Sequence, residues 1–598
     1  MMTLFGMLQA LLIATSVLAV SAKKPNVVFI LTDDQDLHMD SLSYMPNVQK
    51  HLSDQGTYYQ KHYCTIALCC PSRVSLLTGK AAHNTNVTDV EPPYGGYRQF
   101  IEQDLNQNYL PIWLQQSGYN TYYTGKLMNF HHVLNYNKPF PAGWTSSDFL
   151  LDPYTYSYLK SVWQRDQSPP KSAAEQYSTD LLAEKAYAYI EEGARSDSPF
   201  FVALAPIAPH ANVDVNIAGT NVSHTSGDPI PAERHKSLFS DVVVPRTPNF
   251  NPDSPSGVSW IAQLPQQNQT EVDYNDEFYR NRLRALQAVD EMVDGVFKKL
   301  EDLGILENTY VVYSSDNGFH IGQHRLQPGK RCGFEEDINV PLIIRGPGVP
   351  QGETTEIVTT HTDLAPTFFD MLGIDLREDF DGMPIPLTRS GIEDAVSTGH
   401  EHVNVEHWGT VNSEGMYGNP LAAGTKQNPE NTYKALRLVG KEYNLYYSVF
   451  CNNEHELYNL TVRTPAIASE IMLLTLELSW ADPYQMNNLF SSSFKDQEKR
   501  ADSTSDLKKI THRLDALLMV LKTCVAKDCI EPWAVLHPQG NVKNLDEALD
   551  PKYDEFYEKS YETNSVSFTK CEAGQILSSE GSLEPLAYPG EVEWEDFS

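Results

Sequence analysis

The sequence predicts an α/β protein with a large, mostly parallel β-sheet between helices, followed by a smaller C-terminal domain with an antiparallel sheet. Residues 26–31, 198–205 and 309–315 are nearly continuous apolar runs, the pattern of strands that are buried on both faces. Residues 278–300 carry apolar side chains mostly at steps of three and four, which predicts one face of a long helix. From about residue 395 the pattern changes to that of a β-hairpin.

The first 22 residues read as a secretory signal peptide. An apolar run extends from Ala10 to Val20, and Val20 and Ala22 stand at the positions that precede a cleavage site, although no Lys or Arg comes before the run. No other segment offers the roughly 18 uninterrupted apolar residues that a membrane span requires. We therefore expect a soluble mature protein with no membrane partner, either secreted or delivered to a lysosome-like or vacuole-like compartment.

Four Asn-x-Ser/Thr sequons fit passage through a glycosylating secretory route. They are Asn86, Asn221, Asn268 and Asn459. A chain of 598 residues carries a few such triplets by chance, so they support this prediction without establishing it.

Oxygen-bearing side chains follow two of the predicted strands. Asp33 and Asp34 come shortly after the first strand, and Asp316 and Asn317 directly follow the strand at 309–315. Adjacent carboxylates there are costly unless they are solvated or bind a cation, and ligands of open α/β sheets bind at this edge. Hard oxygen ligands select Ca²⁺ or Mg²⁺, and an all-protein cage suits Ca²⁺. A solvated loop and an Asp-Asn-Gly turn remain the alternatives.

The stretch from Cys69 to Lys80 contains the most informative motif. Pro71 suits the first turn of a helix, so Cys69 would stand at the positive end of that helix with Arg73 close behind. An anion would bind well at this place. A structural cysteine at a helix start is the alternative that the motif alone leaves open.

Three further side chains follow predicted strands or turns. Lys126 ends a β-rich run at 118–126, His210 follows the strand at 198–205, and Lys330 precedes a block that runs into a Gly-Pro-Gly segment. Each could be an ordinary surface lysine or a capping histidine. His320 and His324 lie between the Asp-Asn pair and Lys330, and either could be structural.

The net charge of −33 excludes several classes of partner. Nucleic acids, anionic membrane surfaces and long polyanions would all be repelled by the far field of the protein. An anionic substrate must therefore be held by a local cationic pocket.

Eight cysteines are too few to form a disulfide framework for a chain of this length. They are Cys64, Cys69, Cys70, Cys332, Cys451, Cys524, Cys529 and Cys571. Cys524 and Cys529 stand close together after a predicted helix, so we expect a local bridge between them.

The run Cys69-Cys70-Pro71-Ser72-Arg73, followed by Leu77-Thr78-Gly79, resembles the signature of the type I sulfatases. This resemblance extends over about residues 25–490 and includes the arylsulfatase and N-acetylglucosamine-6-sulfatase-like branch. It implies an alkaline-phosphatase-like sandwich with a large central mixed, mostly parallel sheet. It also implies that Cys69 is oxidised to formylglycine by a formylglycine-generating enzyme during maturation.

The resemblance assigns further roles to the candidate residues. One Ca²⁺ ion would be held by Asp33, Asp34, Asp316, Asn317 and the formylglycine made from Cys69. The catalytic and sulfate-binding groups would be Arg73, Lys126, His210 and Lys330. Many members have Trp-His after the lysine that matches Lys126, whereas Leu127-Met128-Asn129 stands here, so Asn129 would substitute as in the glucosamine 6-sulfatase branch.

The predicted domains are a signal peptide at 1–22, a catalytic domain at 23–394, a smaller domain at 395–500 and an extension with an acidic tail at 501–598. Within the smaller domain, residues 433–439 and 443–450 form the predicted hairpin.

We predict a secreted sulfatase that hydrolyses small sulfate esters, aryl sulfates first. An N-acetylglucosamine-6-sulfatase-like glycan sulfatase, a phosphate or phosphonate ester hydrolase, and an inactive glycoprotein that binds sulfated ligands are the alternatives. The sequence leaves the oligomeric state open.

Overall fold

A computed structural model describes most of the chain. The described residues are 23–218, 221–398, 400–417, 430–461, 481–490 and 503–590. The predicted signal peptide and the end of the acidic tail lie outside them. Within the described part, no helix has both the length and the apolar character needed to cross a membrane.

A ten-stranded mixed sheet forms the centre of the molecule. Its strands, in spatial order, are β12 (Glu353–Thr360), β2 (Thr57–Tyr63), β11 (Leu342–Arg345), β10 (Thr309–Ser315), β1 (Asn26–Thr32), β7 (Phe200–Ala205), β3 (Asn120–Gly125), β4 (Ser146–Leu150), β5 (Val162–Arg165) and β6 (Lys171–Ser172). Only β11 and β5 run opposite to the others. The prediction of a mostly parallel central sheet is confirmed.

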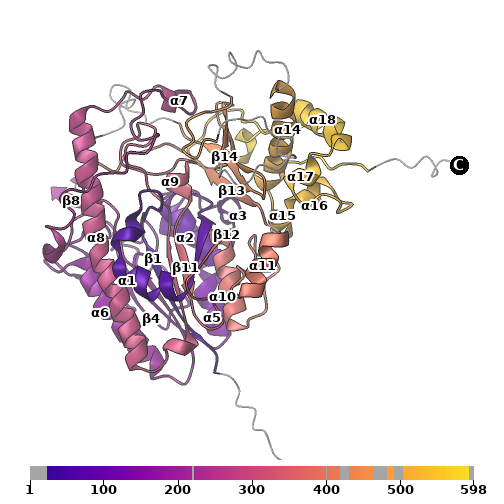
Figure 1. The fold of residues 1–598 in the computed structure, drawn as a ribbon. Helices are drawn as coiled ribbons and strands as arrows, with labels where there is room; N and C mark the ends of the chain where they lie inside the picture. The colour runs from indigo at the N-terminus through magenta and orange to yellow at the C-terminus, as the bar shows by residue number, and fades with distance from the viewer. Residues whose placement is uncertain are drawn as a thin grey trace, which may run out of the picture.

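Helices cover both faces of this sheet (Figure 1). One face packs against α2 (Cys69–Thr78), α5 (Leu110–Gln116) and α10 (Leu364–Leu372), and the other against α1 (Pro46–His51), α6 (Ser178–Ala194) and α8 (Gln269–Asp302). Strand β1 contributes to both layers, since Val27 and Phe29 belong to the first core and Val28 and Ile30 to the second. This alternation explains why the strand reads as a continuous apolar run.

Shorter helices complete the fold. They are α3 (Ala82–Thr85), α4 (Gly96–Glu102), α7 (Ser259–Ala262), α9 (Glu335–Ile338), α11 (Arg389–Thr398), α15 (Lys527–Ile530) and α17 (Leu545–Ala548). The segment between β7 and α8 contains a two-stranded ribbon of β8 (Asn212–Ala218) and β9 (Asn221–Gly227).

The smaller C-terminal part is built on a four-stranded antiparallel sheet. Its strands are β13 (His402–His407), β14 (Tyr433–Val439), β15 (Asn444–Phe450) and β16 (His455–Asn459). The predicted hairpin is β14–β15 and is confirmed. One face of the sheet packs against the larger part, and the other against α14 (Ser503–Leu521), α16 (Pro532–Leu536) and α18 (Asp554–Asn564). The extension after residue 501 therefore shares a core with this sheet.

Two disulfides hold the C-terminal part together. Cys524–Cys529 is the predicted local bridge, and Cys451–Cys571 joins residues 120 positions apart, which the sequence did not indicate. Cys64, Cys69, Cys70 and Cys332 are free and buried.

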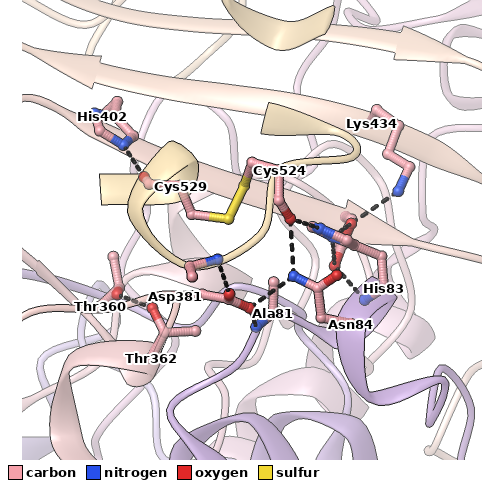
Figure 2. The surroundings of a disulfide bond; sticks show 12 residues. Ala81, His83, Asn84, Thr360, Thr362, Asp381, His402, Lys434, Cys524 and Cys529 are labelled. Carbon is pink, nitrogen blue, oxygen red and sulfur yellow. Dashed lines mark hydrogen bonds and ion pairs between the residues drawn. A yellow bond between two sulfur atoms is a disulfide. The ribbon is translucent and has the colours of Figure 1, made fainter. Parts of the chain in front are cut away.

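The loop closed by Cys524–Cys529 docks on the larger part (Figure 2). The carbonyl oxygen of Cys524 accepts hydrogen bonds from His83 Nε2 at 2.9 Å and Asn84 Nδ2 at 2.8 Å. The backbone N–H of Ala526 donates to Asp381 Oδ1 at 2.6 Å. Since His83 and Asn84 lie on α3, just beyond α2, the extension is fastened near the helix that carries Cys69.

All four sequons lie within the described residues, and the exposure of three of them is known. Asn86 is exposed after α3, and Asn268 is exposed at the start of α8, where its Oδ1 caps Thr270 and Glu271 N–H groups and leaves Nδ2 free of that role. Asn459 is only 8% exposed on β16, which does not favour a glycan there. Asn221 lies on β9.

Replacing Leu517 tests whether the extension is part of the folding unit. Leu517 is fully buried on α14, so Leu517→Ala should lower the free energy of unfolding by about 2–5 kcal/mol. Lys508→Ala, at an exposed position on the same helix, should change it by less than about 0.5 kcal/mol. Chemical denaturation measures both values. Equal, small effects would mean that α14 is dispensable for stability.

Candidate active site

The four predicted oxygen ligands meet at the carboxyl ends of β1 and β10. These parallel neighbours are in register, with Thr32 opposite Ser315, so the residues that follow each strand emerge side by side. The backbone N–H of Asp34 donates to Asp316 Oδ1 at 3.0 Å, and Asn317 Nδ2 donates to Asp34 Oδ1 at 2.8 Å. Asp33, Asp34, Asp316 and Asn317 are all fully buried.

Two oxygens of this cluster are left without a hydrogen bond. Asp34 Oδ2 and Asn317 Oδ1 are buried and have no hydrogen-bond partner among the described residues. A buried oxygen without a donor is costly, and a bound cation would satisfy both atoms. The hard, all-oxygen donor set fits Ca²⁺.

Cys69 is the first residue of α2 and lies next to Asp33 and Asp34. Leu68 before it is extended, and Pro71 occupies the first turn of the helix, as the sequence predicts. Its Sγ lies 3.5 Å from Asp33 Oδ1, 3.8 Å from Asp34 Oδ1 and 3.1 Å from Lys330 Nζ. Burial raises the pKa of the thiol well above its ordinary value, so the unmodified side chain is a neutral thiol and a poor nucleophile.

Lys126 and Arg73 lie beside Asp33 and Asp316. Lys126 Nζ lies 2.6 Å from Asp33 Oδ2, and Arg73 Nε donates to Asp316 Oδ2 at 2.8 Å. Gly125 positions Lys126, because its φ is +114° and a Cβ there would lie 2.0 Å from the carbonyl oxygen of Ala205. The close approach of β7 therefore requires a glycine just before Lys126 at the end of β3.

Lys330 and His210 both lie beside Asp34. Lys330 Nζ donates to Asp34 Oδ1, and His210 Nε2 lies 3.6 Å from Asp34 Oδ2. His210 Nδ1 donates to the carbonyl oxygen of Ala211 at 2.8 Å, which fixes the ring. All five predicted catalytic residues thus surround one cluster.

The lysines, Arg73 and the carboxylates of the cluster favour the charged forms of one another. Burial opposes ionisation of the two lysines, but Asp33 raises the pKa of Lys126 and Asp34 raises that of Lys330. Burial also opposes the charged forms of Asp34 and Asp316, but Lys330 and Arg73 respectively lower the pKa values of these carboxyls. Burial and the neighbouring Asp316 raise the pKa of Asp33. The result is a buried cluster that keeps positively charged side chains beside Cys69.

Two residues that the sequence did not indicate complete the site. The Tyr156 ring stacks on His210 at 4.1 Å between ring centroids and lies 4.7 Å from Lys126 Nζ. Glu414 Oε1 lies 3.2 Å from Lys330 Nζ. Both stand in irregular segments, where no strand or helix pattern marks a functional position.

Among the residues that the structure describes, the remaining candidates do not form hydrogen bonds with Cys69 or the carboxylates beside it. Asn129 Nδ2 donates to the Tyr156 hydroxyl at 2.6 Å, so it supports the site through that ring. His320 Nδ1 lies 2.8 Å from Asp337 Oδ1. His324 stacks on Phe334 at 3.7 Å, and burial lowers its pKa to about 3. Within the described part of the chain, neither histidine forms a hydrogen bond or an ion pair with the residues around Cys69.

Several known proteins are similar to this chain in sequence. The profile of the Sulfatase family matches residues 25–374. An arylsulfatase of Volvox carteri is 34% identical over 92% of this chain and 84% of its own length. The N-acetylglucosamine-6-sulfatase of Homo sapiens is 30% identical over 79% of this chain and 86% of its own length.

Solved structures agree on the fold. One, described as a complex with its substrate D-glucosamine-2-N,6-O-disulfate, superposes with a TM-score of 0.61 at 21% identity, over 82% of this chain and 98% of its own. A phosphonate monoester hydrolase from Silicibacter pomeroyi superposes with a TM-score of 0.53 at 17% identity, over 82% of this chain and 95% of its own. The predicted alkaline-phosphatase-like architecture is confirmed.

Proposed function

The chain belongs to the sulfatase family, and from this premise we propose that it hydrolyses aryl sulfate esters with a formylglycine made from Cys69 and a calcium ion. The observation that supports this most directly is the position of Cys69. It combines a helix N-terminus, two buried carboxylates within 3.8 Å and a charged lysine at 3.1 Å. A neutral, buried thiol has little use there unless it is converted.

The conversion would supply the nucleophile. Hydrated formylglycine carries two hydroxyls; one oxygen attacks sulfur while the S–O bond to the alcohol breaks and the alcohol leaves with a proton. The second hydroxyl then loses its proton, the carbonyl reforms and the bond to the sulfate oxygen breaks. An ordinary serine or cysteine ester has no second hydroxyl and could not release sulfate in this way.

The surrounding residues would hold the substrate. Ca²⁺, bound by Asp33, Asp34, Asp316, Asn317 and the modified Cys69, would supply positive charge that favours ionisation of the nucleophile. Lys126, Lys330 and His210 would contact the sulfate, and Arg73 would hold Asp316 in place through the 2.8 Å bond between them. Preorganised donors of this kind each lower a barrier by roughly 3 kcal/mol.

The site of maturation follows from the same proposal. Two disulfides and the predicted signal peptide fit an oxidising secretory compartment, where a formylglycine-generating enzyme would act on Cys69. Delivery outside the cell or to a lysosome-like compartment remains our proposal.

An N-acetylglucosamine-6-sulfatase-like activity is the second candidate. Asn129 and Tyr156 are the observation that favours it, because Asn129 stands where many members carry histidine and its amide holds the Tyr156 hydroxyl. A substrate panel with aryl sulfates and amino-sugar 6-sulfates separates the two candidates by their kcat/KM values.

Paired aryl sulfate and aryl phosphate esters test the reaction class. We expect kcat/KM for phenyl sulfate to exceed that for phenyl phosphate by about 100-fold, because the two esters share a shape but differ in charge and the proposed site suits a singly charged anion. Release of phenol measures both reactions, with Cys69→Ala as the baseline. A preference for the phosphate ester would indicate a phosphate or phosphonate hydrolase. Binding of phenyl sulfate without release of sulfate would indicate an inactive binding protein.

A further inference from the structure

Glu414 places a carboxylate inside a pocket that is otherwise arranged for an anion. Its Oε1 lies 3.2 Å from Lys330 Nζ and its Oε2 lies 3.7 Å from His210 Nε2, so it faces both of the sulfate-binding candidates on this side of the site. Oε2 is buried and has no hydrogen-bond donor among the described residues. A carboxylate in this position repels a bound anion and lowers the affinity of the site for it. Such a carboxylate is useful only if the site must limit its positive charge.

The backbone holds Glu414 in place. Its N–H donates to the carbonyl oxygen of Pro328 at 2.8 Å, and Ser413 forms a bridge with Gly329, the residue before Lys330. On the other side, the N–H of Met416 donates to the hydroxyl of Tyr274 on α8 at 2.8 Å. The carboxylate is therefore presented by a loop that is anchored to the Lys330 segment and to α8.

The formal charges around Cys69 give this carboxylate a role. Three carboxylates, Asp33, Asp34 and Asp316, face three cations, Arg73, Lys126 and Lys330. With a divalent cation added, and with His210 and the nucleophile neutral, the cluster carries two formal positive charges, which would suit a dianion. Glu414 reduces this to one positive charge, which matches a sulfate monoester, since that ester carries one negative charge.

We propose that Glu414 is a specificity-determining residue that selects singly charged sulfate esters over doubly charged phosphate esters. This inference rests on the proposed function and deepens it. A phosphate monoester loses its second proton near pH 6, so at pH 8 it carries one more negative charge than a sulfate ester of the same shape. Glu414 is only 18% exposed, so solvent screens its repulsion of that extra charge weakly.

The size of the effect follows from Coulomb's law. At an effective dielectric constant of about 20, a unit charge roughly 5 Å away changes the affinity for a bound charge by more than 10-fold, and partial exposure reduces this effect. We therefore expect Glu414→Gln to lower the sulfate-to-phosphate ratio of kcat/KM by about 10-fold or more at pH 8. The substitution keeps the shape of the side chain and removes its charge.

The same comparison can be made by binding alone. In a Cys69→Ala background, calorimetry with phenyl sulfate and phenyl phosphate should show the same shift in relative affinity when Glu414→Gln is added. Wild-type preference tests the proposed function, whereas the shift between variants tests Glu414, so the two can fail separately. Glu442→Gln, at an exposed carboxylate in the β14–β15 turn, is the control for net charge.

A pH series provides a readout that a structural role would not move. At pH 5 phenyl phosphate carries one charge, so the discrimination due to Glu414 should shrink, and Glu414→Gln should show a flatter dependence on pH than the parent protein. Equal losses for both esters would mean that Glu414 only positions Lys330 and would overturn the proposal. An unchanged ratio at pH 8 would overturn it as well.

Discussion

Cys69→Ala should abolish sulfate ester hydrolysis and leave the fold intact. The loss of kcat should be on the order of 10⁶-fold, the size seen when an enzyme loses its nucleophile. Stability should change little, because the substitution removes a single small atom group from the start of α2 and breaks no ion pair. Release of phenol from phenyl sulfate and thermal unfolding measure the two quantities.

Cys70→Ala is the matched control. Cys70 is equally buried in the next position of α2, but it packs in the hydrophobic core, and burial raises the pKa of its thiol to about 12. This variant should retain most of its activity. Mass spectrometry of the peptide that carries Cys69, from the native host, should show an aldehyde in place of the thiol. An unmodified thiol in fully active protein would rule out the mechanism.

The fold was largely readable because the apolar patterns of the buried strands leave few alternatives. Strands β1 and β10 each appear as an apolar run that ends in polar residues, which locates Asp33 and Asp316 at the same edge of the sheet. His210 follows the apolar run of β7 after a short Pro-Ile-Ala-Pro segment and lies at this edge as well. The end of β3 adds Lys126, because a glycine is needed where β3 passes close to β7. Regular structure thus made this half of the site predictable.

The other half depends on tertiary contacts that have no local pattern. Glu414 reaches the pocket because Ser413 pairs with Gly329, a contact between segments more than 80 residues apart. Tyr156 reaches it by stacking on His210, again from an irregular segment. The bridge between Cys451 and Cys571 was missed for the same reason, whereas Cys524 and Cys529 lie five residues apart and their pairing could be expected.

Removing the proposed calcium ion should inactivate the enzyme reversibly and lower its thermal stability. A cation that binds the folded state alone stabilises it by about 2.7 kcal/mol when its concentration is 100 times Kd. We expect one Ca²⁺ per chain by calorimetry, and unfolding at a higher temperature with Ca²⁺ than with a chelator. Asp34→Asn should abolish this Ca²⁺ dependence, whereas Asp54→Asn, at an exposed position after α1, should preserve it.

The stability of Asp34→Asn with and without Ca²⁺ shows whether Asp34 binds the ion or only supports Lys330. Asp34 also balances Lys330, and removing one partner of a buried ion pair costs roughly 3–5 kcal/mol, so the variant should be less stable even with a chelator present. Glu414 remains beside Lys330 and should keep this loss near the lower end of the range. Lower stability that still rises with Ca²⁺ as in the parent protein would show that Asp34 supports Lys330 without binding the ion. Lower stability with no response to Ca²⁺ is expected if Asp34 interacts with both cations. Its Oδ1 would then bind Lys330, and its Oδ2, which accepts no hydrogen bond from the described residues, would bind the metal.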